Sequence, residues 1–502
     1  MLIGGLILPV LFGLAISLLI CPEMRVAERF ALAYGLGFGL LTLAMFFLNL
    51  LGIKFSLTNT SICISGITVG SMLYWKRKKW SSDWLTGLSH FPKRMGEAIG
   101  SLSIFEGIVL GLLIFFGTSN LIIAAYWPIW SWDALAVYDL RARVLAETQS
   151  FPEAALKLMQ PDYLFYYPPM TSLVHAWLYL WGWANPKFFY SLLFISLAVI
   201  FYYSARDYGP GYHCLLFTLI LISTPSLYSH ATCAYTNLTF AFYFSVGTLY
   251  LYRWMSTKKK GFLTLAGLFL GLSSWVRQES TVFFLGYLVV LLYFSISRRR
   301  FFAPLWFAFL YFTIQSLWKI YYPYMARPQS FTTVSPSSSM VSQTSAILIQ
   351  FSNPLSLSSG PGSAFGSILT KLSRIIRLYI GAIVSPLRDS SGLLGQLFDF
   401  VRWKQVLQYL QRNVLMPHRV IAYLFVATIG LYANRIGKHR FLLLLILSSI
   451  ILFAVGTYGF SLRIFYWKAI GGSAERLFMM FVPIIWYFIA LMTAESARRV
   501  KS

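Results

Sequence analysis

The stretch Tyr126-Trp-Pro-Ile-Trp-Ser-Trp-Asp133 decides how this chain is interpreted, because it begins an acidic, aromatic loop between long apolar runs. Acids are scarce in the chain, which has 16 Asp and Glu residues against 41 Lys and Arg residues. Five of the acids nevertheless fall within the single segment 127–170, namely Asp133, Asp139, Glu147, Glu153 and Asp162. This concentration of carboxylates predicts a functional site in the segment.

The composition predicts an all-α integral membrane protein. Of the 502 residues, 58% are hydrophobic and 11% are charged, and the mean hydropathy is +0.66. Ordinary soluble domains carry about 25% charged residues, so this chain has too little polar surface to be one of them. Its apolar runs approach the roughly 20 residues that a helix needs to cross a bilayer, and they lack the alternation of barrel strands. We expect about 13 spans, at residues 1–20, 29–51, 57–75, 104–126, 186–205, 213–232, 236–255, 262–277, 280–297, 301–322, 418–434, 440–460 and 477–496.

Basic clusters follow many of the apolar runs and predict the orientation of the chain. They lie at Lys76–Lys79, Lys258–Lys260, Arg298–Arg300, Arg435–Arg440 and Arg498–Lys501. The positive-inside rule places such clusters in the cytoplasm, and with the spans threaded alternately all of them fall on that side. The net charge of +25 is then a topology signal, and no nucleic-acid partner is expected. The extracytoplasmic side receives 127–170, 323–417, 461–476 and the turn around Arg277, and the protein is expected to be multi-pass in the plasma (inner) membrane.

The chain is expected to divide into four regions. Residues 1–103 form additional N-terminal spans, 104–322 a transmembrane core, 323–417 an extracytoplasmic segment and 418–502 the C-terminal spans. The third region mixes Ser/Thr/Pro-rich runs with basic amphipathic stretches at 368–383 and 393–415, which suit interfacial helices or the solvated face of a small domain. The apolar stretch 171–184 does not fit the alternation, and we expect a juxtamembrane or re-entrant helix there. Cysteines 21, 63, 214 and 233 show no pairing or metal spacing, and His175 and His230 are expected to pack or form hydrogen bonds.

Asp133 is the candidate general base. A carboxylate beside Trp130 and Trp132 at a membrane surface is partly desolvated, which favours proton uptake. Transfer of a sugar needs such a group to deprotonate the acceptor hydroxyl, and it needs cations to stabilise a departing phosphate. The candidate cations are Arg141, Arg143, Arg277, Lys468 and Arg476. The alternative is structural, with Asp133 capping a helix over 134–147.

Three motifs in order resemble the GT-C superfamily of polytopic glycosyltransferases. They are a Trp-Asp pair at the start of an external loop followed by Tyr167-Pro-Pro-Met170, then Trp275-Val-Arg-Gln-Glu279, then Glu475-Arg476-Leu-Phe-Met-Met-Phe-Val-Pro483. The similarity is to the branch with protein O-mannosyltransferases, the lipid A aminoarabinose transferase and the rhizobial galacturonosyltransferases. It covers residues 104–322 well and the end of the chain more loosely.

The resemblance implies roles for particular residues. In that family the first-loop acid is the catalytic base and the donor is a sugar on a polyprenyl phosphate, which assigns the base to Asp133. Many members have two adjacent acids, whereas in this chain Ala134 follows, so the second position is vacant or is filled by Asp139 or Asp162. A divalent metal is therefore left open as a cofactor, because such an ion needs more than one well-placed oxygen. The expected substrate-binding residues are Asp139, Arg141, Asp162, Tyr167, Arg277, Glu279, Lys468 and Arg476.

These observations predict a membrane glycosyltransferase that transfers a sugar, with inversion, from a polyprenyl-phosphate donor to an extracytoplasmic acceptor. The acceptor is a glycan, a lipid or a protein, and the other partners are membrane lipids. A lipid-linked-sugar flippase or transporter is the competing class, although it would place ionisable residues within the spans. A polysaccharide polymerase or ligase is a third possibility, which the segment 323–417 keeps open.

Overall fold

The computed structural model describes residues 3–77, 87–151, 167–296, 302–325, 399–463, 467–469 and 473–499. Two compact units are distinguished, one of residues 1–325 with 404–502 and the other of residues 326–403. Only residues 399–403 of the second unit are described, so most of the predicted segment 323–417, with Ile368–Ile383, lies outside the described residues, as does Asp162. The helical bundle is the first unit.

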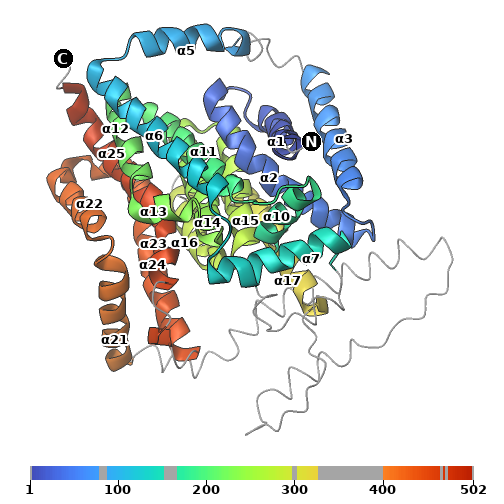
Figure 1. Ribbon diagram of the computed structural model, residues 1–502. Helices are drawn as coiled ribbons and strands as arrows, with labels where there is room; N and C mark the ends of the chain where they lie inside the picture. Colours follow the sequence, from blue (N-terminus) through green and yellow to red (C-terminus); the bar gives the residue numbers. More distant parts are fainter. Residues whose placement is uncertain are drawn as a thin grey trace. The chain divides into compact units, whose positions relative to one another are not determined.

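The described residues fold into helices without strands, which confirms the all-helical prediction (Figure 1). The helices are α1 (Gly4–Ile20), α2 (Val26–Leu50), α3 (Leu57–Arg77), α5 (Phe91–Gly100), α6 (Ile104–Tyr126), α7 (Leu140–Thr148), α10 (Met170–Leu180), α11 (Phe188–Arg206), α12 (Gly211–Ile222), α13 (Pro225–His230), α14 (Thr236–Thr257), α15 (Lys260–Val276), α16 (Ser280–Ile296), α17 (Phe302–Met325), α21 (Phe400–Leu410), α22 (Arg419–Leu431), α23 (Ile436–Arg463), α24 (Ser473–Phe478) and α25 (Val482–Arg499). Short π and 3-10 segments include η1 (Ala134–Asp139), η2 (Gln411–Leu415) and η5 (Met479–Phe481).

Each predicted span coincides with helix, and several helices are long and apolar enough to cross a membrane. Among the described residues, five helical segments are long and apolar enough by length and composition: Val26–Leu50, Ile104–Tyr126, Phe188–Arg206, Ala433–Leu462 and Ser473–Ala494. The pair Phe400–Leu415 and Arg419–Leu431, bent by 100°, would add a sixth as one broken span. The predicted span 213–232 is broken into α12 and α13 at Thr224-Pro225, because proline cannot continue a helix with its missing N–H. The total number of spans stays a prediction.

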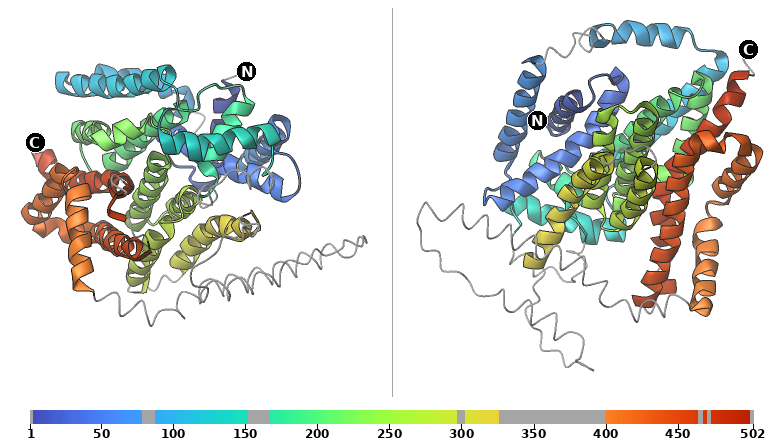
Figure 2. Two further views of the ribbon diagram at one scale, coloured as in Figure 1. Left: turned by 60° about the horizontal axis from the view of Figure 1, so that its bottom comes forward. Right: turned by 180° about the vertical axis from the view of Figure 1, so that it is seen from behind.

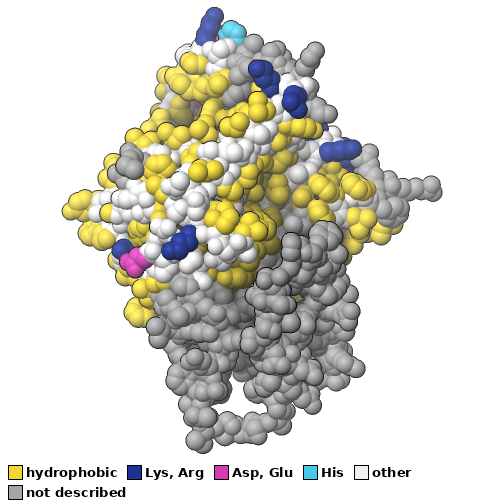
Figure 3. All heavy atoms as spheres, turned by 90° about the vertical axis from the view of Figure 1, so that its right-hand side faces the viewer, with side chains coloured by type: hydrophobic (Ala, Val, Ile, Leu, Met, Phe, Trp, Pro, Cys, Tyr) yellow, Lys and Arg dark blue, Asp and Glu magenta, His cyan; other side chains and the backbone are white. Residues whose placement is uncertain are grey.

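Apolar side chains are exposed over the surface, as expected of helices that face lipid. In α6 only 17% of the apolar window is buried, and Ile104, Ile108 and Phe115 are more than half exposed. The face drawn in Figure 3 likewise shows wide hydrophobic areas with few charged side chains between them. In water such a surface would be costly, whereas in a bilayer it meets hydrocarbon.

Helix α14 lies inside the bundle and packs most extensively on α15, with α11, α25 and η5 around it (Figures 1 and 2). Every residue from Thr236 to Trp254 is buried. A helix that is buried on all sides needs neighbours all round, and this one is apolar and aromatic on every face. Helix α10, at the predicted juxtamembrane stretch 171–184, is also buried, and its 11 residues are too few to span.

Helices α1 and α2 pack backbone to backbone through two glycines. A Cβ atom placed on Gly37 would lie 1.8 Å from the carbonyl oxygen of Pro9, and one placed on Gly13 would lie 2.0 Å from that of Ala33. Small residues at such crossings are typical of membrane helices, where close approach supplies the packing energy.

The helix ends that the predicted threading puts on one side do contact one another. At the end that carries the basic clusters, which we call the basic end, Asp207 pairs with Arg25 and with Arg253, each at 2.9 Å. Further contacts there are Arg253 with Glu28, Lys259 with Glu23, and Arg435 with the carbonyl of Met492. The ion pairs join the ends of α2, α11 and α14 and the start of α15, and the bond from Arg435 joins the segment before α23 to α25.

Gly37→Ala is expected to lower the free energy of unfolding by about 3 kcal/mol or more, because the methyl group has no space and α1 must move away from α2. Gly111→Ala in α6 is the matched control, since a Cβ atom there meets no atom within 4 Å. Thermal unfolding in one detergent measures both variants. Equal stability of the two would contradict the close crossing.

Single-cysteine labelling tests the orientation. In a background without the native cysteines 21, 63, 214 and 233, Glu147→Cys should react with an impermeant maleimide in intact cells, because the acidic loop is predicted to be extracytoplasmic. Lys260→Cys, at the basic end, should react only after permeabilisation. The reverse labelling pattern would show that the protein has the opposite orientation in the membrane.

Candidate functional site

A small pocket of about 50 Å³ brings together residues from five separate segments of the chain. Its lining residues are Asp133, Tyr138, Tyr167, Tyr235, Thr236, Asn237, Arg277, Ser473 and Arg476. Four of them, Asp133, Tyr167, Arg277 and Arg476, are residues that the sequence singled out. Ligand pockets usually measure about 300–1,000 Å³, so this one has room for the charged end of a ligand and not for a whole one.

Asp133 forms an ion pair with Arg476, whose Nη1 donates to Oδ2 at 2.9 Å. The Asp133 side chain remains 43% exposed, and the described part of the chain offers no partner to its other oxygen, Oδ1. The alternative role as a helix cap is wrong, because the side chain of Asp133 makes no capping hydrogen bond and its backbone is already helical. The turns that follow form the π-helix η1, a geometry that often marks functional sites.

The loop that carries Asp133 is anchored by the turn between α10 and α11. Asn185 Nδ2 and Lys187 Nζ both donate to the carbonyl oxygen of Trp127, each at 2.9 Å. These two bonds hold the loop backbone six residues before the acid. The position of Asp133 is therefore determined from both sides, by this anchor and by Arg476.

Arg476 is one of the two cations of the pocket and comes from the last turn of the short helix α24. Its Nη2 donates to Ser473 Oγ at 3.3 Å, and its guanidinium lies 5.2 Å from the ring centroid of Tyr235. A planar guanidinium held by a carboxylate, a hydroxyl and an aromatic face keeps one orientation. Its position next to Asp133 depends on the packing of the last helices against α14.

Arg277 reaches the pocket from the turn between α15 and α16. Its Nη1 donates to Asn237 Oδ1 at 2.8 Å, and its Nη2 donates to Glu279 Oε1 at 2.7 Å. Burial lowers the pKa of Arg277, but Glu279 and Tyr167 raise it by more, so that it ends above its usual value. Burial likewise raises the pKa of Glu279, and Arg277 outweighs this and brings it below its usual value. Both groups are charged at neutral pH, and Arg277 Nε and Glu279 Oε2 are buried without a partner in the described structure.

The N-terminus of α14 completes the pocket. Thr236 and Asn237 are the first residues of this 22-residue helix, and helix N-termini attract anions through their free N–H groups and the helix dipole. The preceding Ala234 is buried with a left-handed φ of +59°, a strained conformation for alanine, and its carbonyl accepts a hydrogen bond from Tyr190 at 3.2 Å. With two arginines and a helix N-terminus against two paired carboxylates, the pocket favours an anion.

Arg141 lies behind the pocket and not in it. It is buried, and its guanidinium donates to Ser172 Oγ at 2.8 Å and to the carbonyl oxygens of Tyr167 and Pro168 at 2.9 and 3.1 Å. Burial lowers the pKa of Arg141 to about 10, which still leaves it protonated at neutral pH. Arg141 therefore holds the backbone of Tyr167 in place. The expected direct contact with substrate is not supported by this position.

Asp139 is also buried, with only 2% of its surface exposed. Its carboxylate accepts hydrogen bonds from Arg143 at 3.0 Å and from Tyr179, and His175 Nδ1 lies 3.3 Å away. Burial raises the pKa of Asp139, while these partners together lower it by more, so it is ionised. A substrate cannot reach this carboxylate. His175 forms hydrogen bonds, as expected, and its other nitrogen contacts Tyr190 at 2.8 Å.

Two further expectations concern Lys468 and a metal. Lys468 is exposed beside the ring of Trp467 and does not line the pocket. Among the described residues there is no group of three His, Cys, Asp or Glu side chains that could hold a metal ion, and Asp162 lies outside those residues. Ala134, next to Asp133, supplies no oxygen from its side chain, so a divalent ion at Asp133 would need ligands from elsewhere.

Sequence reasoning did not select Tyr138, Tyr235, Thr236, Asn237 or Ser473 for the site. A signal for three of them was present, because they stand at the start of the apolar run 236–255, where a helix N-terminus was expected on the same side as Asp133. Ser473 has no such signal, since only the fold shows that it reaches Arg476.

Comparison with known proteins identifies no relative of this chain. No family model matches it, and no curated protein or solved structure matches it either. Its function is therefore inferred from the pocket itself and from the motifs that supply its residues.

Arg141→Lys is expected to lower the free energy of unfolding by about 2–4 kcal/mol, because lysine keeps the charge but cannot bond three acceptors in the plane of a guanidinium. Arg143→Lys is the matched control two residues away. Its side chain is 58% exposed, so its ion pair with Asp139 should contribute about 1 kcal/mol or less. Thermal unfolding would contradict the role of Arg141 if the two variants lost the same stability.

Proposed function

We propose that this protein is a membrane glycosyltransferase of the GT-C type, which transfers a sugar from a polyprenyl-phosphate donor to an extracytoplasmic acceptor with inversion. The observation that carries the proposal is the convergence of Asp133, Arg277 and Arg476 on one pocket, from three motifs that lie far apart in the sequence. A carboxylate with an open oxygen next to two arginines is the combination that this transfer needs.

The donor phosphate fits the cationic side of the pocket. Arg277 and Arg476 present guanidinium donors, and the N-terminus of α14 adds backbone N–H groups at Thr236 and Asn237. As the bond between the anomeric carbon and the phosphate oxygen breaks, negative charge grows on the lipid phosphate. Fixed donors in a partly buried site stabilise that charge in the transition state.

Asp133 acts on the acceptor. Its Oδ1 accepts the proton of the acceptor hydroxyl while that oxygen forms its bond to the anomeric carbon, on the face opposite the departing phosphate. The products are the glycosylated acceptor, the free lipid phosphate and a proton on Asp133. The pocket admits the phosphate, and the sugar lies outside it, next to a loop with the exposed rings of Trp130 and Trp132.

Asp133→Asn should reduce transfer by about 10²–10⁴-fold, because an amide cannot accept the proton of the acceptor. The assay follows release of polyprenyl phosphate from lipid-linked sugars, with purified protein in nanodiscs made from a total membrane lipid extract. Glu147→Gln, which removes an acid of the same loop that does not line the pocket, is the matched control and should leave turnover unchanged.

Arg476→Gln separates the two roles in the pocket. It should lower turnover and also weaken binding of polyprenyl phosphate, whereas Asp133→Asn should retain that binding. Wild-type protein that moves a lipid-linked sugar across the bilayer without releasing phosphate would identify a flippase instead. Turnover near wild type in Asp133→Asn would show that Asp133 is not the general base.

A further inference from the structure

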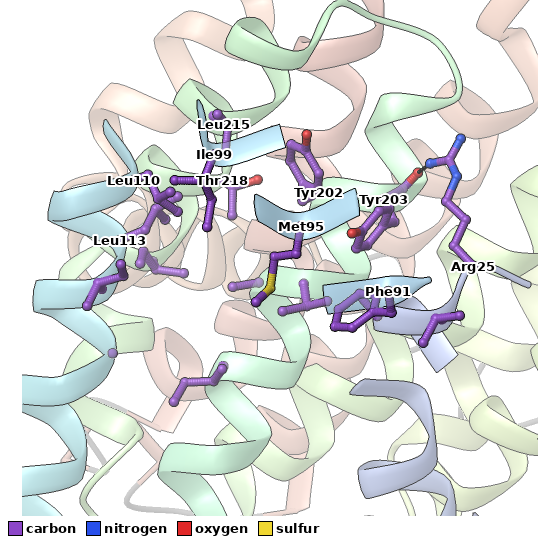
Figure 4. Close-up of a pocket in the computed structure, with 18 of the residues that line it drawn as sticks. Arg25, Phe91, Met95, Ile99, Leu110, Leu113, Tyr202, Tyr203, Leu215 and Thr218 are labelled. Atoms are coloured by element: carbon purple, nitrogen blue, oxygen red, sulfur yellow. Dashed lines mark hydrogen bonds between the residues drawn. The ribbon is translucent and has the colours of Figure 1, made fainter. Parts of the chain in front are cut away.

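A second cavity lies near the basic end of the helices and shares no lining residue with the pocket at Asp133. Its volume is about 1,340 Å³, which exceeds the roughly 300–1,000 Å³ of sites for drug-sized ligands. The walls come from α6, α11 and α12, with α5 and the start of α2 at the edge (Figure 4). The lining is apolar for most of its extent, with Leu113, Phe194, Ile195 and Ile222 as examples.

Helix α5 turns an apolar stripe toward this cavity. Phe91, Met95 and Ile99 are spaced by four residues, share one face of the helix and all line the cavity (Figure 4). Met95 and Ile99 remain 50% and 54% exposed, and α5 makes no extensive contact with another described helix. The stripe therefore faces space that the described part of the protein leaves unfilled.

Positive charge borders the cavity. Arg94 of α5 lines it and has no acid as an ion-pair partner within the described residues, while its neighbour Lys93 lies on the same helix but does not line the cavity. Arg25, on the other side, pairs with Asp207 and lies over the ring of Tyr203. The acid in the lining, Glu23, pairs with Lys259.

We propose that this cavity binds an anionic glycerophospholipid of the membrane leaflet at the basic end. The acyl chains lie between α6, α11 and α12 beneath the stripe of α5, and the phosphate lies at Arg94 with Arg25 nearby. Three observations support this occupant: the apolar walls, a volume above that of small-ligand sites, and an arginine at the edge that no described acid neutralises. A basic amphipathic helix that lies in the interface is attracted to anionic headgroups, and α5 has this character. The proposal does not depend on the transferase activity.

Native mass spectrometry of the purified full-length protein tests the headgroup. Protein exchanged into dioleoylphosphatidylglycerol should retain one bound lipid that dioleoylphosphatidylcholine does not displace. Arg94→Glu should weaken retention at least about five-fold, because each basic group near a headgroup contributes about that factor and the variant also adds repulsion. Lys93→Glu, with the same charge change on the same helix, should change it less than two-fold. Equal effects of the two variants would contradict the placement of the lipid phosphate at Arg94.

Filling the cavity tests the acyl chains. Gly117→Phe should abolish retention, since a Cβ atom at Gly117 meets Ile195 only at an ordinary 3.6 Å and the ring must then extend into the cavity. Gly111→Phe is the control on the same helix, because Gly111 does not line the cavity and has open space. Ala198→Leu, from the opposite wall, should weaken retention as well, which guards against a folding defect in Gly117→Phe. Retention unchanged in both filling variants, or displacement of the phospholipid by polyprenyl phosphate, would overturn the proposal.

Discussion

The burial of α14 from Thr236 to Trp254 is the constraint on which both ends of this molecule depend. Its N-terminus supplies Thr236 and Asn237 to the pocket, and near its C-terminus Arg253 joins Glu28 and Asp207. A helix that is enclosed from Thr236 to Trp254 cannot slide or rotate without opening a cavity or creating a clash on some face, and either change is costly in a close-packed interior. The end that carries the pocket and the basic end are thus held at a fixed separation by a single rigid element.

The ion pairs have different tasks at the two ends. The pair of Arg253 with Glu28 is buried, and the cost of removing both charges from water offsets much of their attraction, so its net contribution to stability is small. The pair of Asp133 with Arg476 is partly exposed, so it contributes little energy. It cannot be what brings residues 343 positions apart together. Packing of η5 and α25 against α14 brings Asp133 and Arg476 together, and the ion pair forms as a consequence.

Much of the fold and half of the site could be predicted from the sequence, for identifiable reasons. Apolar runs and basic clusters are local signals, so each expected span contains helix. Asp133 stands out because acids are scarce in the chain, and Arg277 and Arg476 stand out because they lie at the ends of apolar runs opposite to the basic clusters. Asp139 and Arg141 look equivalent to them in sequence, yet both are buried and bonded to Arg143, Ser172 and the backbone near Tyr167, which only the tertiary fold determines. The large cavity could not be predicted from the sequence, because its existence depends on how closely the helices pack in the tertiary fold.

The pairing of Asp133 with Arg476 has a consequence under the proposed function. Before the donor binds, Oδ2 of the carboxylate is occupied by the guanidinium of Arg476. A lipid phosphate between Arg277 and Arg476 competes for the same guanidinium, because phosphate is a strong bidentate acceptor. Once the phosphate binds this guanidinium, the carboxylate of Asp133 is released from the ion pair and can turn toward the acceptor hydroxyl. The same arginine would then stabilise the leaving group and couple activation of the base to occupancy of the site, which limits transfer to water when no donor is bound.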